Sequence, residues 1–226
     1  MLPKPIRNIA VIALICCGTI LTDAQSQPTQ LEVPNAPIPI HVLVQSPADT
    51  KTKLQIICLF QSASANTLHG SLTEINEKLS GLLDQIRKPE SFAGILGETL
   101  LITPPPGKMT ADKIFIIGLG DSQSYTPQRM ELVGSIVYRE ADRLGIDHPF
   151  FAPTVLDGGV TGFSTSETAE WFIHGFLRAA ASEKQLAGAG YARGITIGEL
   201  TFLAGATHAK DTRDGIAKAC AAATGK

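Results

Sequence analysis

The sequence predicts an α/β protein, a three-layer α/β/α sandwich in which helices cover both faces of a mixed sheet. Two observations predict this fold class. Short runs rich in apolar and β-branched residues alternate with amphipathic helical segments along most of the 226 residues. Several of those runs are apolar at consecutive positions, which is typical of strands that are covered on both faces.

Six short runs are the predicted strands, and turn-forming residues lie between them. The connection between the third and fourth runs, residues 104–112, has the sequence PPPGKMTAD and indicates a hairpin loop. Three of the other connections carry a predicted helix, and a fourth helix follows the last run. In chain order the predicted strands cover residues 38–44, 54–60, 99–103, 113–118, 150–155 and 195–204.

The first predicted helix spans residues 71–86. Ser71 and Glu74 have the spacing of a capping box, in which each side chain bonds a free backbone N–H of the first turn. Apolar residues follow at three- and four-residue spacing, which gives the segment one face for the core. Pro89 then ends the helical pattern.

The other three helices also have recognisable starts. Thr126-Pro127 predicts an N-cap followed by a proline in the first turn. Ser164 and Glu167 form a second capping-box pattern ahead of an apolar stripe that reaches residue 180. The last helix is predicted to start near Asp211. These starts complete the alternation of strands and helices.

Residues 1–24 are predicted to be a secretory signal peptide. Lys4 and Arg7 form a basic start, residues 9–21 carry no charge, and Ala24 suits a cleavage site. The uncharged stretch spans about 20 Å as a helix, which is short of the ~30 Å hydrocarbon core. The alternatives are an uncleaved anchor and, less favoured, lipid attachment at one of two cysteines, Cys16 and Cys17. A periplasmic or secreted location is therefore expected.

The residues after the signal peptide divide into two parts. Residues 25–37 are polar and contain spaced prolines, which predicts a flexible lead-in. Residues 38–226 are then one domain. Removing two basic and one acidic residue from 19 and 21 leaves 17 against 20, a mature net charge of −3. This balance gives no attraction to nucleic acid, and no membrane contact is expected after cleavage.

Two cysteines remain in the mature chain, Cys58 and Cys220. An exported protein can form a disulfide, so a bridge between them is one interpretation. Cys58 lies within an apolar run, however, and Cys220 lies on the apolar face of the last helix. The favoured prediction is two buried free thiols.

Motifs that would identify an enzyme are incomplete. Gly118-Leu119-Gly120-Asp121 follows a strand as a dinucleotide fingerprint would, but Gln123 stands where a third glycine belongs. The stretch 162–166 resembles a nucleophile elbow except that its last residue is Ser166 instead of glycine. The five histidines are scattered, and no pair has metal-ligand spacing. The sequence thus predicts no catalytic residue, no metal ligand and no cofactor.

An ordered set of segments resembles a known family. Residues 98–102 read ETLLI, residues 113–121 read KIFIIGLGD, and Tyr125-Thr126-Pro127 follows with its helix. Together with the helix that contains residues 166–176, they resemble the amino-terminal domain of the leucyl (cytosol) aminopeptidase family. The resemblance covers residues ~38 to ~224.

The resemblance implies a macro-domain-like fold and places peptidase chemistry elsewhere. In that family, catalysis lies in the carboxy-terminal domain, at a two-metal site with Lys, Asp and Glu ligands in a signature of the type NTDAEGRL. Nothing like that signature occurs here, and the chain ends at Lys226, about where such a domain would begin. The expectation is that no catalytic or metal residue carries over.

Ligand-binding candidates follow from the resemblance to macro domains, which hold a diphosphate with a glycine-rich loop ahead of a helix. Two stretches correspond, 68–71 with one glycine and 157–162 with three. The alternative is that 157–162 is merely a connection to the next helix. In such folds, ligands bind at the loops that follow parallel strands. The candidate residues are Ser62, Gly120, Asp121, Gly158, Gly159 and Ser164.

Three functions remain open at this point. The first is an exported stand-alone domain that acts by binding or assembly, with a protein partner or with copies of itself, and has no peptidase site. The second is a macro-type binder or hydrolase of ADP-ribose or another small nucleotide-type ligand. The third is an accessory subunit of a separately encoded metallo-aminopeptidase.

Overall fold

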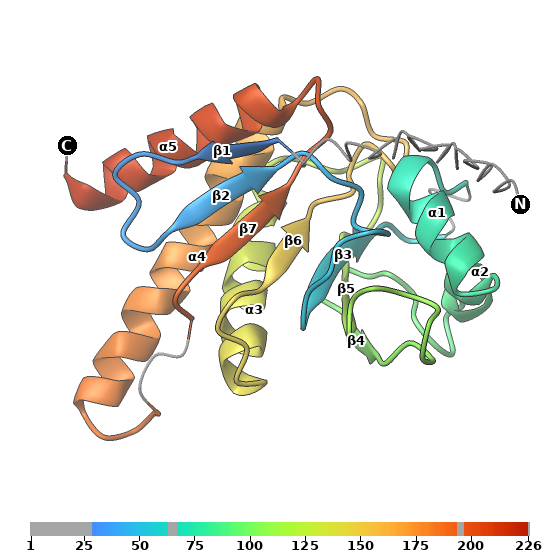
Figure 1. Ribbon diagram of the computed structural model, residues 1–226, viewed down its shortest axis with the longest axis horizontal. Coiled ribbons are helices and arrows are strands. Elements are labelled where there is room, and N and C mark those ends of the chain that lie inside the picture. Colours follow the sequence, from blue (N-terminus) through green and yellow to red (C-terminus); the bar gives the residue numbers. More distant parts are fainter. Residues whose placement is uncertain (1–28, 63–66, 194–196, 226) are drawn as a thin grey trace, which may run out of the picture.

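The computed structural model describes residues 29–62, 67–193 and 197–225 (Figure 1). The predicted signal peptide, residues 1–24, lies outside the described residues, as does the start of the lead-in. Within the described ranges, no helix is both long and apolar enough to span a bilayer.

A mixed sheet of seven strands forms the middle layer, in the order β1-β2-β7-β6-β3-β5-β4. The five inner strands run parallel, whereas β1 and β4 pair antiparallel at the two edges. The predicted hairpin is the pair β4 and β5. The strands are β1 (Gln30–Glu32), β2 (Ile40–Leu43), β3 (Gln55–Leu59), β4 (Thr99–Ile102), β5 (Ile114–Gly118), β6 (Phe150–Ala152) and β7 (Leu200–Leu203).

Helices cover both faces of the sheet, which confirms the predicted three-layer α/β/α sandwich (Figure 1). Three long helices pack on one face: α3 (Arg129–Arg143), α4 (Thr165–Gly188) and α5 (Ala209–Thr224). Two short helices, α1 (Gly70–Lys78) and α2 (Leu82–Ile86), pack on the other. Strand β3 is buried at every position because Ile56 and Cys58 face the long helices while Ile57 and Leu59 face the short ones.

Glycines let the three long helices approach one another at backbone distance. A Cβ atom built on Gly134 of α3 would lie 2.0 Å from the carbonyl oxygen of Phe172 on α4. One on Gly175 of α4 would lie 1.8 Å from the carbonyl oxygen of Glu131 on α3. At Gly215 of α5 the corresponding distance to an α4 carbonyl is 2.0 Å. The absence of a side chain at these positions therefore sets the spacing of this layer.

The first predicted capping box is wrong. Helix α1 begins at Gly70, its N-cap residue is His69, and no side chain caps it there. The Ser71 hydroxyl donates to Asp157 instead, and Glu74 accepts a hydrogen bond of 2.5 Å from Ser46. Both side chains are thus used in tertiary contacts. By contrast, Ser164 caps α4 as predicted, accepting from the backbone N–H of Ser166 at 3.1 Å.

Three element boundaries also differ from the prediction. The helix predicted over 71–86 is broken because Ser80 and Gly81 both have positive φ, 59° and 81°. Helix α3 starts at Arg129, since residues 126–128 form a tighter turn in which the Arg129 N–H bonds the Thr126 carbonyl. Strand β1 lies within the predicted flexible lead-in, where pairing with β2 orders it.

Cys58 and Cys220 are buried free thiols, as predicted. Cys58 lies in the middle of β3 and Cys220 on the buried face of α5. Burial raises the pKa of both thiols, that of Cys220 to about 11. Neither is therefore a thiolate at neutral pH.

Candidate functional site

A pocket of about 500 Å³ opens where the parallel strands β2, β7 and β6 end. The segments that follow those strands form its wall, together with the first turns of α1, α4 and α5. In an open parallel sheet, loops of this kind meet at one edge and provide the usual place for a ligand. The lining residues are Val44, Gln45, Ser46, Pro47, Ser71, Glu74, Ala152, Pro153, Thr154, Val155, Leu156, Asp157, Val160, Phe163, Thr165, Thr168, Phe202, Leu203, Ala204, Gly205, His208 and Thr212.

Most of the wall is apolar. Phe202 comes from β7, Val155 and Val160 from the segment after β6, and Phe163 from the approach to α4. Phe163 is held at the wall by an edge-to-face contact with Tyr125, with ring centroids 5.2 Å apart. A ligand with an apolar body would therefore bury that body here.

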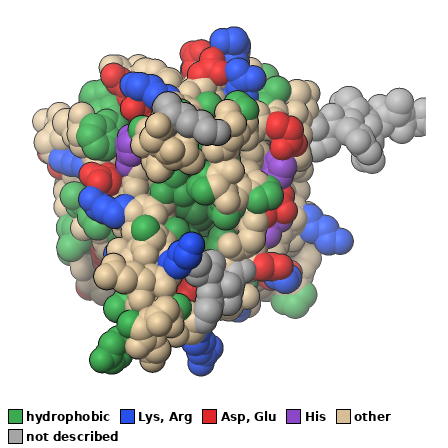
Figure 2. Space-filling view, turned by 90° about the vertical axis from the view of Figure 1, so that its left-hand side faces the viewer, with side chains coloured by type: hydrophobic (Ala, Val, Ile, Leu, Met, Phe, Trp, Pro, Cys, Tyr) green, Lys and Arg blue, Asp and Glu red, His purple; other side chains and the backbone are tan. Residues whose placement is uncertain are grey.

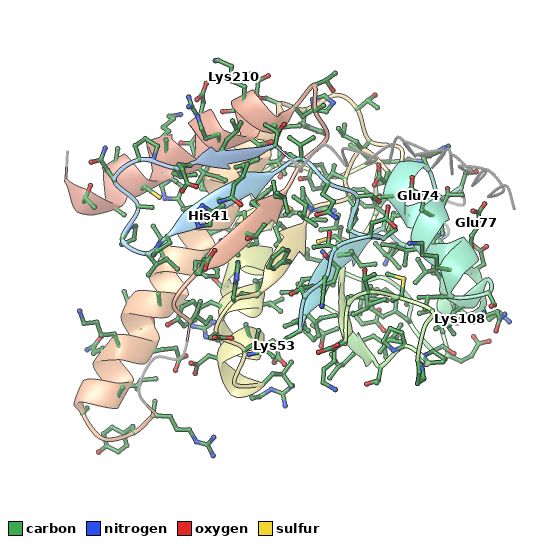
Figure 3. All side chains as sticks on the ribbon, in the orientation of Figure 1. His41, Lys53, Glu74, Glu77, Lys108 and Lys210 are labelled. Carbon is green, nitrogen blue, oxygen red and sulfur yellow. The ribbon has the colours of Figure 1, made fainter. Side chains whose placement is uncertain are left out.

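Two carboxylates are among the polar groups of the pocket. Glu74 projects from α1 and Asp157 from the segment after β6 (Glu74 is labelled in Figure 3). Asp157 accepts hydrogen bonds from both the hydroxyl and the backbone N–H of Ser71. Its own backbone carbonyl accepts from the N–H of His69 at 2.9 Å. The segment after β6 is thereby fastened to the start of α1.

Burial raises the pKa of the Asp157 carboxyl. The hydrogen bonds from Ser71 oppose that rise, the charge of Glu74 adds to it, and His69 lowers it. The two carboxylates are thus close enough to repel each other. A positively charged or hydrogen-bond-donating group placed between them would relieve that repulsion.

Thr154 lines the floor of the pocket and has an unusual backbone conformation. Its φ is 49°, which is rare for a β-branched residue. The hydroxyl donates to the carbonyl of Cys58 at 2.6 Å and accepts from the N–H of the same residue at 2.9 Å. The side chain of Thr154 therefore continues the pairing of β6 with β3 beyond the last strand residue.

Three of the six predicted ligand residues border this pocket. Gly158 is buried against Phe60, whose ring would lie 2.6 Å from a Cβ atom at that position. Gly159 is exposed, has φ of 84° and faces the ring of His69. The Ser164 hydroxyl is used in the cap of α4. The two glycine-containing stretches suggested by sequence, 68–71 and 157–162, are in contact with each other.

The other three predicted residues lie at the ends of β3 and β5. The Gly120 carbonyl accepts from the N–H of Gln61, next to Ser62, at 3.0 Å. The Asp121 backbone carbonyl accepts from the Arg129 guanidinium at 2.9 Å. None of the six residues belongs to the lining itself. The sequence analysis missed Ser46, Glu74 and His208, which line the pocket. Their signal was a position within a few residues of a predicted strand end or helix start.

Two histidines that looked scattered in the sequence meet on the sheet face opposite the long helices. His41 on β2 (Figure 3) lies between Glu32, at 2.7 Å, and Glu199, at 3.0 Å. His148 reaches the same Glu199 oxygen at 3.2 Å, and burial lowers the pKa of its imidazole. Even so, no group of three ligating side chains suited to a metal ion occurs in the described ranges.

Charge is mixed over the face drawn in Figure 2. Basic and acidic side chains are interspersed there, and apolar side chains gather near its middle. This face offers no extended basic stripe of the kind that follows a nucleic-acid backbone.

Comparison with known proteins adds a family and a fold. The model of the cytosol aminopeptidase family, N-terminal domain, matches residues 56–182. A search of curated proteins returned no relative.

Solved structures similar to this chain are of two kinds. A tomato leucine aminopeptidase mutant has 19% identity and a TM-score of 0.60 over 87% of this chain, which spans 37% of the aminopeptidase. A Trypanosoma brucei macrodomain in complex with ADP has 13% identity and a TM-score of 0.55, covering 78% of this chain and 68% of its own. An Oceanobacillus iheyensis macrodomain mutant with ADPR has 14% identity and a TM-score of 0.55, and the match covers 88% of this chain and 100% of that one. At these identities the likeness is one of fold.

Proposed function

We propose that this chain, which belongs to the cytosol aminopeptidase family because the model of that family's N-terminal domain matches more than half of it, acts by binding. The observation that carries the proposal is the pocket of about 500 Å³ at the ends of β2, β7 and β6. A cavity of this size accommodates a small organic molecule. Its lining combines an extensive apolar wall with a few polar groups, as ligand sites do.

Binding is favoured over peptide hydrolysis by the chemistry of the lining. Its carboxylates have hydroxyl partners, and no group of three ligating side chains that could hold a metal ion occurs among the described residues. With Zn²⁺ or Mn²⁺ added, we expect the purified protein to leave a chromogenic leucyl anilide uncleaved. Turnover that copurifies with the protein would contradict a binding role.

A thermal-shift screen tests whether the pocket has a small-molecule ligand. A ligand at 100 times its dissociation constant adds about 2.7 kcal/mol, which corresponds to a midpoint shift of roughly 5–10 °C for this length. Val160→Trp should abolish the shift by filling the pocket, whereas Leu186→Trp, at an exposed position on α4, should leave it unchanged. A shift that survives Val160→Trp would place the ligand elsewhere.

A nucleotide-type ligand is one version of this function, supported by the ADP and ADPR named in the titles of two similar structures. Titration with ADP and ADP-ribose tests it directly. Val160 is a better position to block than Gly158, since any side chain at Gly158 would collide with the ring of Phe60 and disturb the fold.

Assembly with protein is the second candidate function, and the side of the molecule near β4 favours it. Edge strand β4 exposes Leu101, and Ile95 and Leu96 are exposed in the segment before it. That segment lies against α3, where Leu132 is also exposed. The partner would be a second copy or a separately encoded aminopeptidase subunit. If the protein is oligomeric in light scattering, Leu132→Glu should reduce its mass and Leu186→Glu should not.

Export is part of the proposal and rests on residues 1–24, with their basic start and uncharged stretch. We expect the mature protein outside the cytoplasm, beginning at residue 25. Cell fractionation and N-terminal sequencing of the protein test this. Recovery of an intact N-terminus from the cytoplasmic fraction would contradict it.

A further inference from the structure

The charged side chains that line the pocket are both acidic. Glu74 and Asp157 line it, and no Lys or Arg occurs among the lining residues of the described chain. His208 is the remaining titratable group in the lining. A phosphorylated or carboxylated ligand would meet these carboxylates without a cation to offset them.

At the start of α1, the place where an anion would bind is already used by the chain itself. The N-terminus of a helix attracts anions because its first backbone N–H groups are free and its dipole is positive there. At α1, the Asp157 carboxylate takes the Ser71 N–H and hydroxyl. It also lies directly over Gly70, 2.5 Å from where a Cβ atom would be. An anionic ligand would have to displace this internal carboxylate.

Basic residues close to the pocket in sequence are directed to other partners. On α5, Lys210 and Arg213 both pair with Asp214, at 2.9 and 2.5 Å (Lys210 is labelled in Figure 3). Neither side chain is among those that line the cavity. The first turns of α5 therefore bring no positive side chain to the ligand.

We propose that the pocket binds a small organic amine, with the ammonium group at Glu74 and Asp157 and an apolar body against Phe163 and Phe202. This inference rests on the proposed binding function and names the ligand class for the same site. The apolar wall determines that the ligand has a hydrophobic body, and the two carboxylates determine the charge of its head. A pocket with two carboxylates and no Lys or Arg in its lining is poorly suited to a diphosphate.

Three probes that share one apolar body test the charge preference: 2-phenylethylamine, 2-phenylethanol and phenylacetate. Calorimetric titration of the purified protein at pH 8 and low ionic strength should give the order amine, alcohol, acid. We expect the amine to bind roughly tenfold or more tightly than the acid, because even a partly solvated carboxylate favours a nearby cation. Added salt should weaken the binding of the amine and leave the affinity for the alcohol unchanged.

A matched pair of variants on α1 shows whether the pocket carboxylate is responsible. Glu74→Gln should weaken the binding of 2-phenylethylamine about threefold and leave the affinity for 2-phenylethanol unchanged. The expected effect is modest because Glu74 is exposed at the rim. Glu77→Gln, one turn away and outside the lining, should change neither (both residues are labelled in Figure 3). Equal effects of the two variants would show that the preference is a general surface effect and would overturn the proposal.

The outcomes also distinguish this inference from the proposed function. If phenylacetate or ADP binds more tightly than the amine, and Val160→Trp abolishes that binding, the site is a ligand pocket but the charge inference is wrong. If no probe, nucleotide or dipeptide binds, both the binding function and the inference fail.

Discussion

Replacing Gly175 with alanine should destabilise the protein substantially, because this glycine sets the distance between α3 and α4. The new Cβ atom would lie 1.8 Å from the carbonyl oxygen of Glu131 and 2.6 Å from its carbon. An ordinary carbon–oxygen contact begins near 3.4 Å, so the two backbones must separate by roughly 1.6 Å. The obstructing atoms belong to a helix backbone, which has no alternative rotamer to adopt.

The energetic cost can be worked from the packing. Moving α4 outward opens gaps around its buried side chains, among them Phe172 and Phe176. A gap of even 1 Å removes up to about half of the dispersion energy of the atoms that line it. Overpacking by one methyl typically costs about 1–3 kcal/mol, and the helix propensity of alanine returns up to about 1 kcal/mol. We expect a net loss of about 2 kcal/mol, which is a fall in midpoint of roughly 4–8 °C.

Gly188→Ala provides the control, since Gly188 ends the same helix and has no atom within 4 Å of a built Cβ. That variant should keep or slightly raise the midpoint through helix propensity. Thermal unfolding followed by circular dichroism compares the two. If Gly175→Ala is as stable as Gly188→Ala, the close approach of the helices does not determine stability and the reasoning fails.

Three further predictions concern the pocket floor, the buried carboxyl and the thiols. Thr154→Val should cost about 2 kcal/mol or more in urea unfolding because it leaves the backbone groups of Cys58 unpaired, whereas Thr154→Ser should be nearly neutral. Burial raises the pKa of Asp157, so its contribution to stability is present below the ordinary carboxyl pKa and is lost as pH rises through the raised one. Asp157→Asn, which keeps an acceptor for Ser71, should therefore be at least as stable as the parent at pH 7 and lose that advantage near pH 3; a large loss at pH 7 would contradict this. Iodoacetamide at pH 8 should leave Cys58 and Cys220 unmodified in peptide mapping until denaturant is added, because burial raises the pKa of both thiols.

The layer architecture could be predicted from the sequence because it depends on local patterns. Consecutive apolar positions in β3 predicted a strand covered on both faces, and its residues alternate between the two cores. The proline-rich turn at 104–112 predicted the antiparallel pair of β4 and β5. The start of α4 at Ser164 was also predictable, because a cap depends only on neighbouring residues.

Features that depend on distant partners were not predictable. The pattern of Ser71 and Glu74 suits a cap, but Asp157 and Ser46 compete for the same side chains and form the contacts found in the fold. A glycine within an amphipathic helix gives no sign of which backbone it will face, so the role of Gly175 could not be anticipated. The pocket combines segments after β2, β6 and β7, whose adjacency follows from the strand order.

The position of β7 in the sheet has a consequence for the order in which the molecule can fold. This strand lies between β2 and β6, and its first residue pairs with Ile40, far back in the sequence. Until β7 is in place, β1 and β2 form a two-stranded ribbon with no strand connecting it to the rest of the sheet, and such ribbons are only marginally stable. A chain still being synthesised would therefore hold this ribbon apart until β7, Leu200–Leu203, emerges. Joining segments so distant in sequence is expected to be slow, so the pairing of β2 with β7 should be a late step of folding.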